Sequence, residues 1–116
     1  MEKTRFVYQD STLTVKILGD IDHHNAKAVR EEADKIIFGR KPRLILLDLS
    51  AVEFMDSSGL GLILGRYNLA EEIGAEFKII KPAPSVLRVL ELAGIERIMK
   101  IEGGENDVRR VIDNDP

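Results

Sequence analysis

The sequence predicts an α/β domain built on one mixed β-sheet, with an N-terminal hairpin and about four α-helices. Two β-type segments come first, and strand-like and helix-like segments then alternate, as they do where helices connect parallel strands. The chain has 116 residues, of which 44% are hydrophobic and 32% charged. This length suffices for one hydrophobic core but not for two. We therefore expect residues 1–116 to form a single domain.

The N-terminal part predicts a hairpin followed by a helix. Residues 4–9 and 13–18 are β-type runs separated by Asp10-Ser11-Thr12, which has the polar composition of a tight turn. Helical spacing follows, and Gly39 is the natural end of that helix. The apolar residues on one face of this predicted helix are Ala26, Val29, Ala33, Ile36 and Ile37.

The remaining elements alternate between strands and helices. The unbroken apolar run 44–47 indicates a strand covered on both faces, at the centre of the sheet. Further along, the pattern predicts a helix over 57–73 ending at Gly74, a strand over 77–80, a helix over 84–93 ending at Gly94 and a short strand over 98–101. Val108, Val111 and Ile112 lie at helical spacing and indicate a terminal amphipathic helix.

Composition argues against several classes of partner. The net charge is −3, and the basic residues are dispersed among acids rather than gathered into a stripe, so nucleic acid is not an expected ligand. The uncharged runs 44–47 and 60–65 fall far short of the roughly 18 residues that a membrane helix needs. The N-terminus lacks the pattern of a secretory signal, and the chain has no cysteine, so we expect a cytoplasmic protein without a membrane partner.

One candidate site lies at the junction of the hairpin and the first helix, in Gly19-Asp20-Ile21-Asp22-His23-His24. Imidazole and carboxylate groups both bind transition metals, which would suit a small metal-dependent phosphohydrolase using Asp22, His23 and His24. However, the sequence supplies no further ligand cluster with recognisable spacing. The alternative is that Asp22 caps the first helix by accepting hydrogen bonds from its free N–H groups. We favour the capping role and expect no metal.

A second candidate is Phe54-Met55-Asp56-Ser57-Ser58-Gly59-Leu60-Gly61, between a predicted strand and the second long helix. A serine nucleophile elbow needs glycine two residues before the serine, where this chain has Met55. A phosphate-binding loop needs Gly-Lys-Ser/Thr after its first glycine, and none of the glycines here is followed by that lysine. We therefore expect no catalytic residue, and Asp56, Ser57 and Ser58 have the residue types of a helix N-cap.

The predicted helix 57–73 carries more apolar and small residues than one core face requires. The stripe that can face the sheet is Leu60, Ile63, Leu64, Tyr67 and Ala70. Ser57, Gly61 and Gly65 are spaced four apart along one flank, while Leu62 and Leu69 point nearly opposite this stripe. Glycine inside a helix suggests close approach of another backbone. Spacing alone does not distinguish a docked partner from a neighbouring helix of the same domain.

At these residues the sequence resembles the STAS family of anti-sigma factor antagonists. The resemblance rests on the segment from Phe54 to Tyr67, on Gly19-x-x-Asp22-His23-His24, and on residues 85–95, and it extends over nearly the whole chain. The Asp-His-His and Leu-Gly-Arg-Tyr segments favour the anti-sigma-F antagonists of endospore-forming bacteria. The predicted fold is accordingly a single STAS-type domain.

The resemblance implies a partner switch rather than an enzyme, and no cofactor. The unphosphorylated antagonist would bind an anti-sigma factor serine kinase with bound ADP or ATP and free the sigma factor. Phosphorylation at Ser57, the first serine of the turn, would end binding, and a PP2C-type phosphatase would restore it. The predicted partner-binding residues are Asp22, Asp56, Ser58, Gly59, Gly61, Leu62, Gly65 and Leu69. The alternatives are a STAS module of another pathway, such as general stress response, and the metal-dependent phosphohydrolase.

Overall fold

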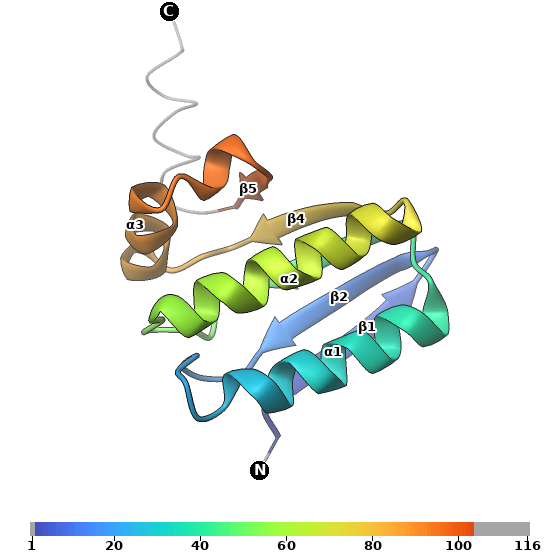
Figure 1. The fold of residues 1–116 in the computed structure, drawn as a ribbon, viewed down its shortest axis with the longest axis horizontal. Helices are drawn as coiled ribbons and strands as arrows, with labels where there is room; N and C mark the ends of the chain where they lie inside the picture. The colour runs from blue at the N-terminus through green and yellow to red at the C-terminus, as the bar shows by residue number, and fades with distance from the viewer. Residues whose placement is uncertain (1, 104–116) are drawn as a thin grey trace, which may run out of the picture.

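A five-stranded β-sheet with its strands in sequence order forms the base of the fold (Figure 1). In this computed structural model, which describes residues 2–103, the strands are β1 (Thr4–Gln9), β2 (Thr12–Ile17), β3 (Leu44–Asp48), β4 (Glu76–Ile80) and β5 (Lys100–Glu102). β1 pairs antiparallel with β2, and the three following pairs are parallel. The predicted mixed sheet with an N-terminal hairpin is confirmed.

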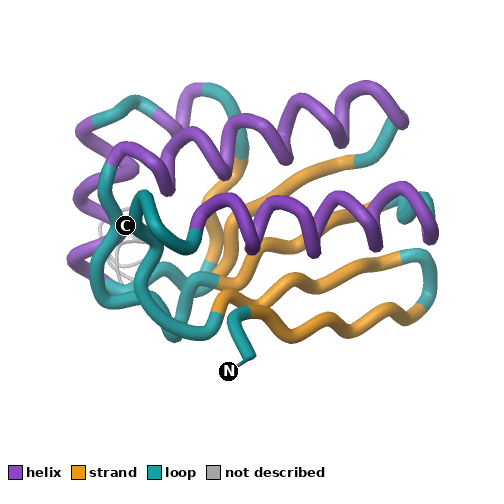
Figure 2. Tube along the Cα trace, turned by 60° about the horizontal axis from the view of Figure 1, so that its bottom comes forward, coloured by secondary structure: helices purple, strands orange, loops and turns teal. Residues whose placement is uncertain are grey.

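Three α-helices and one short 3₁₀-helix connect the parallel strands. They are α1 (Ala26–Arg40), α2 (Ser57–Ile73), α3 (Pro84–Leu92) and the 3₁₀-helix η1 (Ile95–Arg97). The two long helices, α1 and α2, run side by side across the same face of the sheet (Figure 2). The fourth predicted helix, around Val108, Val111 and Ile112, lies outside the described residues.

The hairpin turn consists of two residues with left-handed backbone conformation. Asp10 has a φ of 53° and Ser11 a φ of 62°, and the residues on either side, Gln9 and Thr12, are paired. Positive φ at both central residues is the requirement of a type I′ turn, whose twist matches that of the flanking strands. The second strand therefore begins at Thr12, one residue earlier than the sequence predicts.

Strand β3 lies at the centre of the sheet, as predicted, but among residues 2–103 helices cover only one of its faces. Ile45 and Leu47 are buried and share a small apolar cavity with residues of α1 and α2. Leu44 and Leu46 point to the opposite face and are half-buried. The expectation of a strand covered on both faces is wrong here, because both long helices pack against the same side.

The core fills the space between the sheet and the two long helices. Its fully buried or nearly fully buried members include Leu13, Val15, Ile17, Val29, Ala33, Ile37, Ile45, Leu47, Ile63, Ala70 and Ile79. Burial of apolar side chains on this scale is the main source of stability in a domain of this size. The core therefore fixes the positions of both helix N-termini.

The predicted helix boundaries agree closely with the structure except at the end of α1. Gly39 lies within α1, which continues to Arg40; Lys41, with a φ of 48°, forms the left-handed C-cap and donates its N–H to the Ile37 carbonyl at 2.8 Å. Helix α2 begins and ends as predicted, and Gly74 is its left-handed C-cap. The last strand begins only at Lys100 because η1 comes before it.

Candidate partner-docking site

Three loops meet beyond the carboxyl ends of the parallel strands, which is where open α/β sheets place their binding sites (Figure 1). The β2–α1 and β3–α2 loops are joined by a short parallel bridge between Ile21 and Met55. The Ile21 N–H donates to the Phe54 carbonyl at 3.1 Å. The start of α3, which follows the β4–α3 loop, is tied to them because the Ser85 hydroxyl donates to the Glu53 carbonyl at 2.9 Å.

Asp20 braces the first two loops against each other. Its Oδ1 accepts hydrogen bonds from the backbone N–H groups of Glu53 at 3.1 Å and Phe54 at 3.0 Å. Asn25 supports this arrangement, because its side chain donates to the Asp20 carbonyl and accepts from the Asp22 N–H at 3.0 Å. The bracing role of Asp20 cannot be predicted from the sequence, since its bonds join residues more than thirty positions apart, and the supporting role of Asn25 depends on it.

Asp22 caps the turn before α1 rather than the helix itself. Its Oδ1 accepts from the N–H groups of His24 at 2.9 Å and Asn25 at 3.1 Å. The helix begins at Ala26 with Asn25 at the N-cap position, so the prediction that Asp22 is the helix cap is wrong by about one turn. The rings of His23 and His24 are 6.2 Å apart and inclined by 64°. Within residues 2–103, no group of three His, Cys, Asp or Glu side chains could hold a metal ion.

Ser57 is the first residue of α2 and is exposed. Asp56 is the N-cap, with its Oδ1 accepting from the Ser58 N–H at 2.8 Å and its carbonyl accepting from the Gly59 N–H at 3.0 Å. The Ser57 hydroxyl has no hydrogen-bond partner within residues 2–103 and is accessible from solvent.

Phe54 presents an exposed aromatic ring three residues before Ser57. Its side chain is 57% exposed, although its backbone is held by Asp20 and Ile21 on the neighbouring loop. Exposed aromatic residues on a rigid backbone are typical of protein interfaces. The exposure of Phe54 cannot be predicted from the sequence, because a lone aromatic residue can belong to the core or to the surface.

The glycines of α2 have different surroundings. A Cβ atom on Gly59 would lie 2.0 Å from Met55 Cγ and 3.3 Å from Ile21 Cγ2, so Gly59 is needed for internal packing. A Cβ atom on Gly61 or Gly65 would meet nothing within 4 Å. The structure thus assigns close packing to Gly59 and open surroundings to Gly61 and Gly65.

Leu62 and Leu69 are buried, and the prediction that they point away from the core is wrong. Their exposed fractions are 5% and 8%. The physical reason is that α2 packs against both the sheet and α1. The buried part of its circumference is therefore wider than a single stripe of apolar residues. Leu62, Arg66 and Leu69 are buried together at the spacing of one helix face, whereas the predicted core residues Leu60, Leu64 and Tyr67 are only half-buried.

An ion pair joins the two long helices. Arg66 Nε on α2 lies 2.7 Å from Asp34 Oδ1 on α1, and the Arg66 side chain is only 9% exposed. Burial lowers the pKa of the Arg66 guanidinium; Asp34 opposes this shift, and the positive charge of Arg30 adds to it. This pair cannot be predicted from the sequence, because Arg66 lies among residues that a simple amphipathic pattern assigns to the surface.

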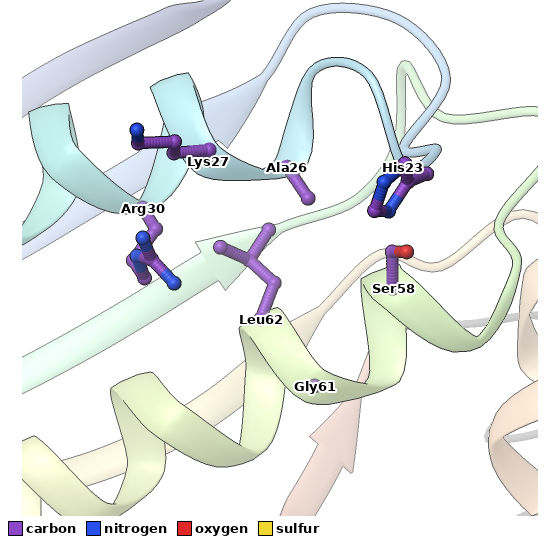
Figure 3. A pocket seen from close by; sticks show the side chains of 7 residues that line it. All are labelled: His23, Ala26, Lys27, Arg30, Ser58, Gly61 and Leu62. Atoms are coloured by element: carbon purple, nitrogen blue, oxygen red, sulfur yellow. The ribbon is translucent and has the colours of Figure 1, made fainter.

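A groove of about 430 Å³ lies between the N-terminal parts of α1 and α2, next to Ser57. The side chain of Ser58 points across it toward His23, while Lys27 and Arg30 extend from α1 (Figure 3). Its remaining lining residues are Ala26, Gly61 and Leu62. The geometry therefore gathers three predicted site residues, Ser58, Gly61 and Leu62, beside the cationic side chains of Lys27 and Arg30.

Comparison with known proteins identifies the family of this chain. The STAS domain family matches residues 4–108. The chain is 42% identical over 93 residues to an anti-sigma F factor antagonist of Paenibacillus polymyxa, covering 80% of each chain. It is 29% identical over 100 residues to the anti-sigma-B factor antagonist of Bacillus subtilis, covering 82% of this chain and 89% of that one. It therefore belongs to the STAS family of anti-sigma factor antagonists.

A solved structure supports the same fold. The unphosphorylated anti-sigma factor antagonist SpoIIAA superimposes with a TM-score of 0.75 at 24% identity, covering 97% of this chain and 98% of that one. Within the part of the chain that the structure describes, no helix is long and apolar enough to cross a membrane.

Proposed function

We propose that this protein is the antagonist in a partner switch controlled by phosphorylation of Ser57. In its unphosphorylated form it binds an anti-sigma factor serine kinase with bound ADP or ATP and releases the sigma factor in the cytoplasm. The observation that carries the proposal is the position of Ser57, which is exposed at the start of α2 on a frame of mutually bonded loops. The names of the relatives at 42% and 29% identity support the same class of function.

The proposed docking surface combines the loops and the open flank of α2. It consists of Asp22, Phe54, Asp56, Ser57, Ser58, Gly61 and Gly65. Gly59 and Leu69 support this surface from inside, because both are buried, and Leu62 contributes to the wall of the groove. In this proposal the protein is the substrate and binding partner of the kinase, in keeping with the names of its relatives. A PP2C-type phosphatase would restore the hydroxyl.

The switch works through local charge and bulk. A phosphoryl group adds about −1.5 to −2 charges at neutral pH, and the N-terminus of a helix tolerates such a charge. The fold is retained because Ser57 is exposed. The partner surface, by contrast, must accept a larger, charged group that loses water on contact and lies beside the Asp56 carboxylate. Each 1.4 kcal/mol of penalty weakens binding about tenfold, so a modest mismatch suffices.

The comparison favours an anti-sigma-F kinase over an anti-sigma-B kinase as the partner, because identity to the F-type antagonist is higher. Titration of the protein against both kinases tests this choice. We expect tighter binding to the F-type kinase. Preference for the B-type kinase would assign the protein to the general stress pathway instead.

Substitution of Gly61 by glutamine tests the docking surface. Because a side chain at this position meets open space, Gly61→Gln leaves the fold intact while blocking the approach of a partner. We expect at least about a tenfold loss of affinity for the kinase, equal to 1.4 kcal/mol, by calorimetry.

The matched control is Gly39→Gln, which places the same side chain in open space on α1, near its C-terminus. This variant should bind like wild type, and circular dichroism checks that both variants are folded. Unchanged affinity of folded Gly61→Gln would show that the open flank of α2 is not the docking surface.

A further inference from the structure

We propose that the groove between α1 and α2 receives an acidic side chain of the anti-sigma partner, with Arg30 and Lys27 as its cationic ligands. This inference rests on the proposed function and adds a charge-recognition subsite to it. The groove is lined on the α1 side by His23, Lys27 and Arg30 and on the α2 side by Ser58 and Gly61 (Figure 3). Its volume of about 430 Å³ is ample for one carboxylate side chain.

The cations at this groove are poorly neutralised by the protein itself. Lys27 lies 3.9 Å from Glu31, but both side chains are largely exposed, so this pair is weak. Asp34 is held by the buried Arg66. Within residues 2–103, Arg30 forms no ion pair with a carboxylate. Its positive charge also reaches Arg66, whose pKa it helps to lower.

The position of the groove determines what covers it. Ser58 and Gly61 line the groove and also belong to the proposed docking surface, so a partner seated over Ser57 covers the cations as well. A cation that loses water without gaining an opposite charge is strongly unfavourable. Arginine at such a position pairs with a carboxylate through two parallel hydrogen bonds. A partner that binds here must therefore present an aspartate or glutamate.

Neutralisation of the cations tests the subsite. Arg30 and Lys27 are exposed, so Arg30→Gln and Lys27→Gln are expected to fold like wild type. Calorimetry with the ADP-bound kinase should show about a tenfold loss of affinity for Arg30→Gln and a smaller loss for Lys27→Gln. The matched control is Lys35→Gln, which makes the same change in charge on α1 at an exposed position that does not line the groove. It should bind within about twofold of wild type.

Charge reversal identifies the occupant. Arg30→Glu should nearly abolish binding, and one member of a panel of kinase variants in which surface aspartates and glutamates are changed to arginine should restore it. If no kinase variant in the panel restores binding of Arg30→Glu, the occupant of the groove is not an acidic side chain of the kinase. If wild type binds the kinase and Arg30→Gln binds equally well, the subsite is wrong and the proposed function stands. If wild type binds no anti-sigma kinase, the proposed function itself fails.

Discussion

Two glycines of α2 that lie two positions apart illustrate how residue identity serves both packing and function. Gly59 is buried against the side chains of Met55 and Ile21, which belong to the two loops that frame the site. Gly61 faces the groove and open solvent. The first glycine lets the loops approach the start of α2, and the second leaves open space on the surface beside Ser57, where we propose that a partner docks.

Alanine substitutions at these glycines should have opposite effects on stability. Gly59→Ala forces a methyl group into the Met55 side chain, and overpacking of this kind costs about 1–3 kcal/mol. Gly61→Ala gains helix propensity without a clash, so we expect unchanged stability or an increase of up to about 1 kcal/mol. Urea unfolding of both variants measures the difference. Equal stability of the two would contradict the packing described for Gly59.

For single residues, the sequence predicts local hydrogen bonds better than it predicts contacts with residues far away in the chain. The Asp56-Ser57-Ser58 turn could be predicted because capping depends on local hydrogen bonds, and the structure indeed places Asp56 at the N-cap of α2. Asp20 could not be predicted, because its bonds to the Glu53 and Phe54 amides exist only after two distant loops come together. The role of Gly59 depends in the same way on the position of Met55.

Helix α2 is buried on two sides, and this arrangement decides which of its residues can meet a partner. The sheet covers one side and α1 covers another, so Leu62, Arg66 and Leu69 are removed from the surface. The boundaries of α2 could be predicted from its N-cap and Gly74. The residues that α2 buries could not be predicted, because a pattern of apolar residues does not reveal how many neighbouring elements a helix has. Nor does it reveal that an arginine will be buried with an aspartate.

The Asp34–Arg66 pair should stabilise the contact between the two long helices. Asp34→Ala leaves the Arg66 guanidinium buried without its opposite charge, and we expect the free energy of unfolding to fall by about 1–3 kcal/mol. This is below the range for fully buried pairs because Asp34 is partly exposed. In the double variant Asp34→Ala/Arg66→Met no uncompensated charge remains. The loss of stability in the double variant should therefore be smaller than the sum of the losses in Asp34→Ala and Arg66→Met.

Urea unfolding of the four proteins completes this double-mutant cycle. Additive losses would show that the two side chains do not stabilise each other. Asp34→Ala as stable as wild type would show that Arg66 needs no opposite charge at this contact.

The whole molecule combines a frame of mutually bonded loops with an exposed serine, Ser57. The core between the sheet and helices fixes the starts of α1 and α2, and hydrogen bonds between the loops hold Ser57 at their junction. The alternation of strands and helices predicts the mixed sheet with its N-terminal hairpin, because parallel neighbours need crossover connections, but it does not predict the order of the strands. Since Ser57 is exposed and its hydroxyl makes no hydrogen bond within residues 2–103, a charge added there should change the surface without rearranging the core.

Phosphorylation of the intact protein by its cognate kinase tests the central claim most directly. The modified site is mapped by mass spectrometry, and backbone NMR spectra and kinase affinity are compared before and after modification. We expect phosphate on Ser57, spectral changes confined to the loops around it and to the start of α2, and a loss of kinase affinity of at least about tenfold. Modification of Ser58 alone, spectral changes reaching the β1–β2 hairpin, or unchanged affinity of the phosphorylated protein would contradict the account.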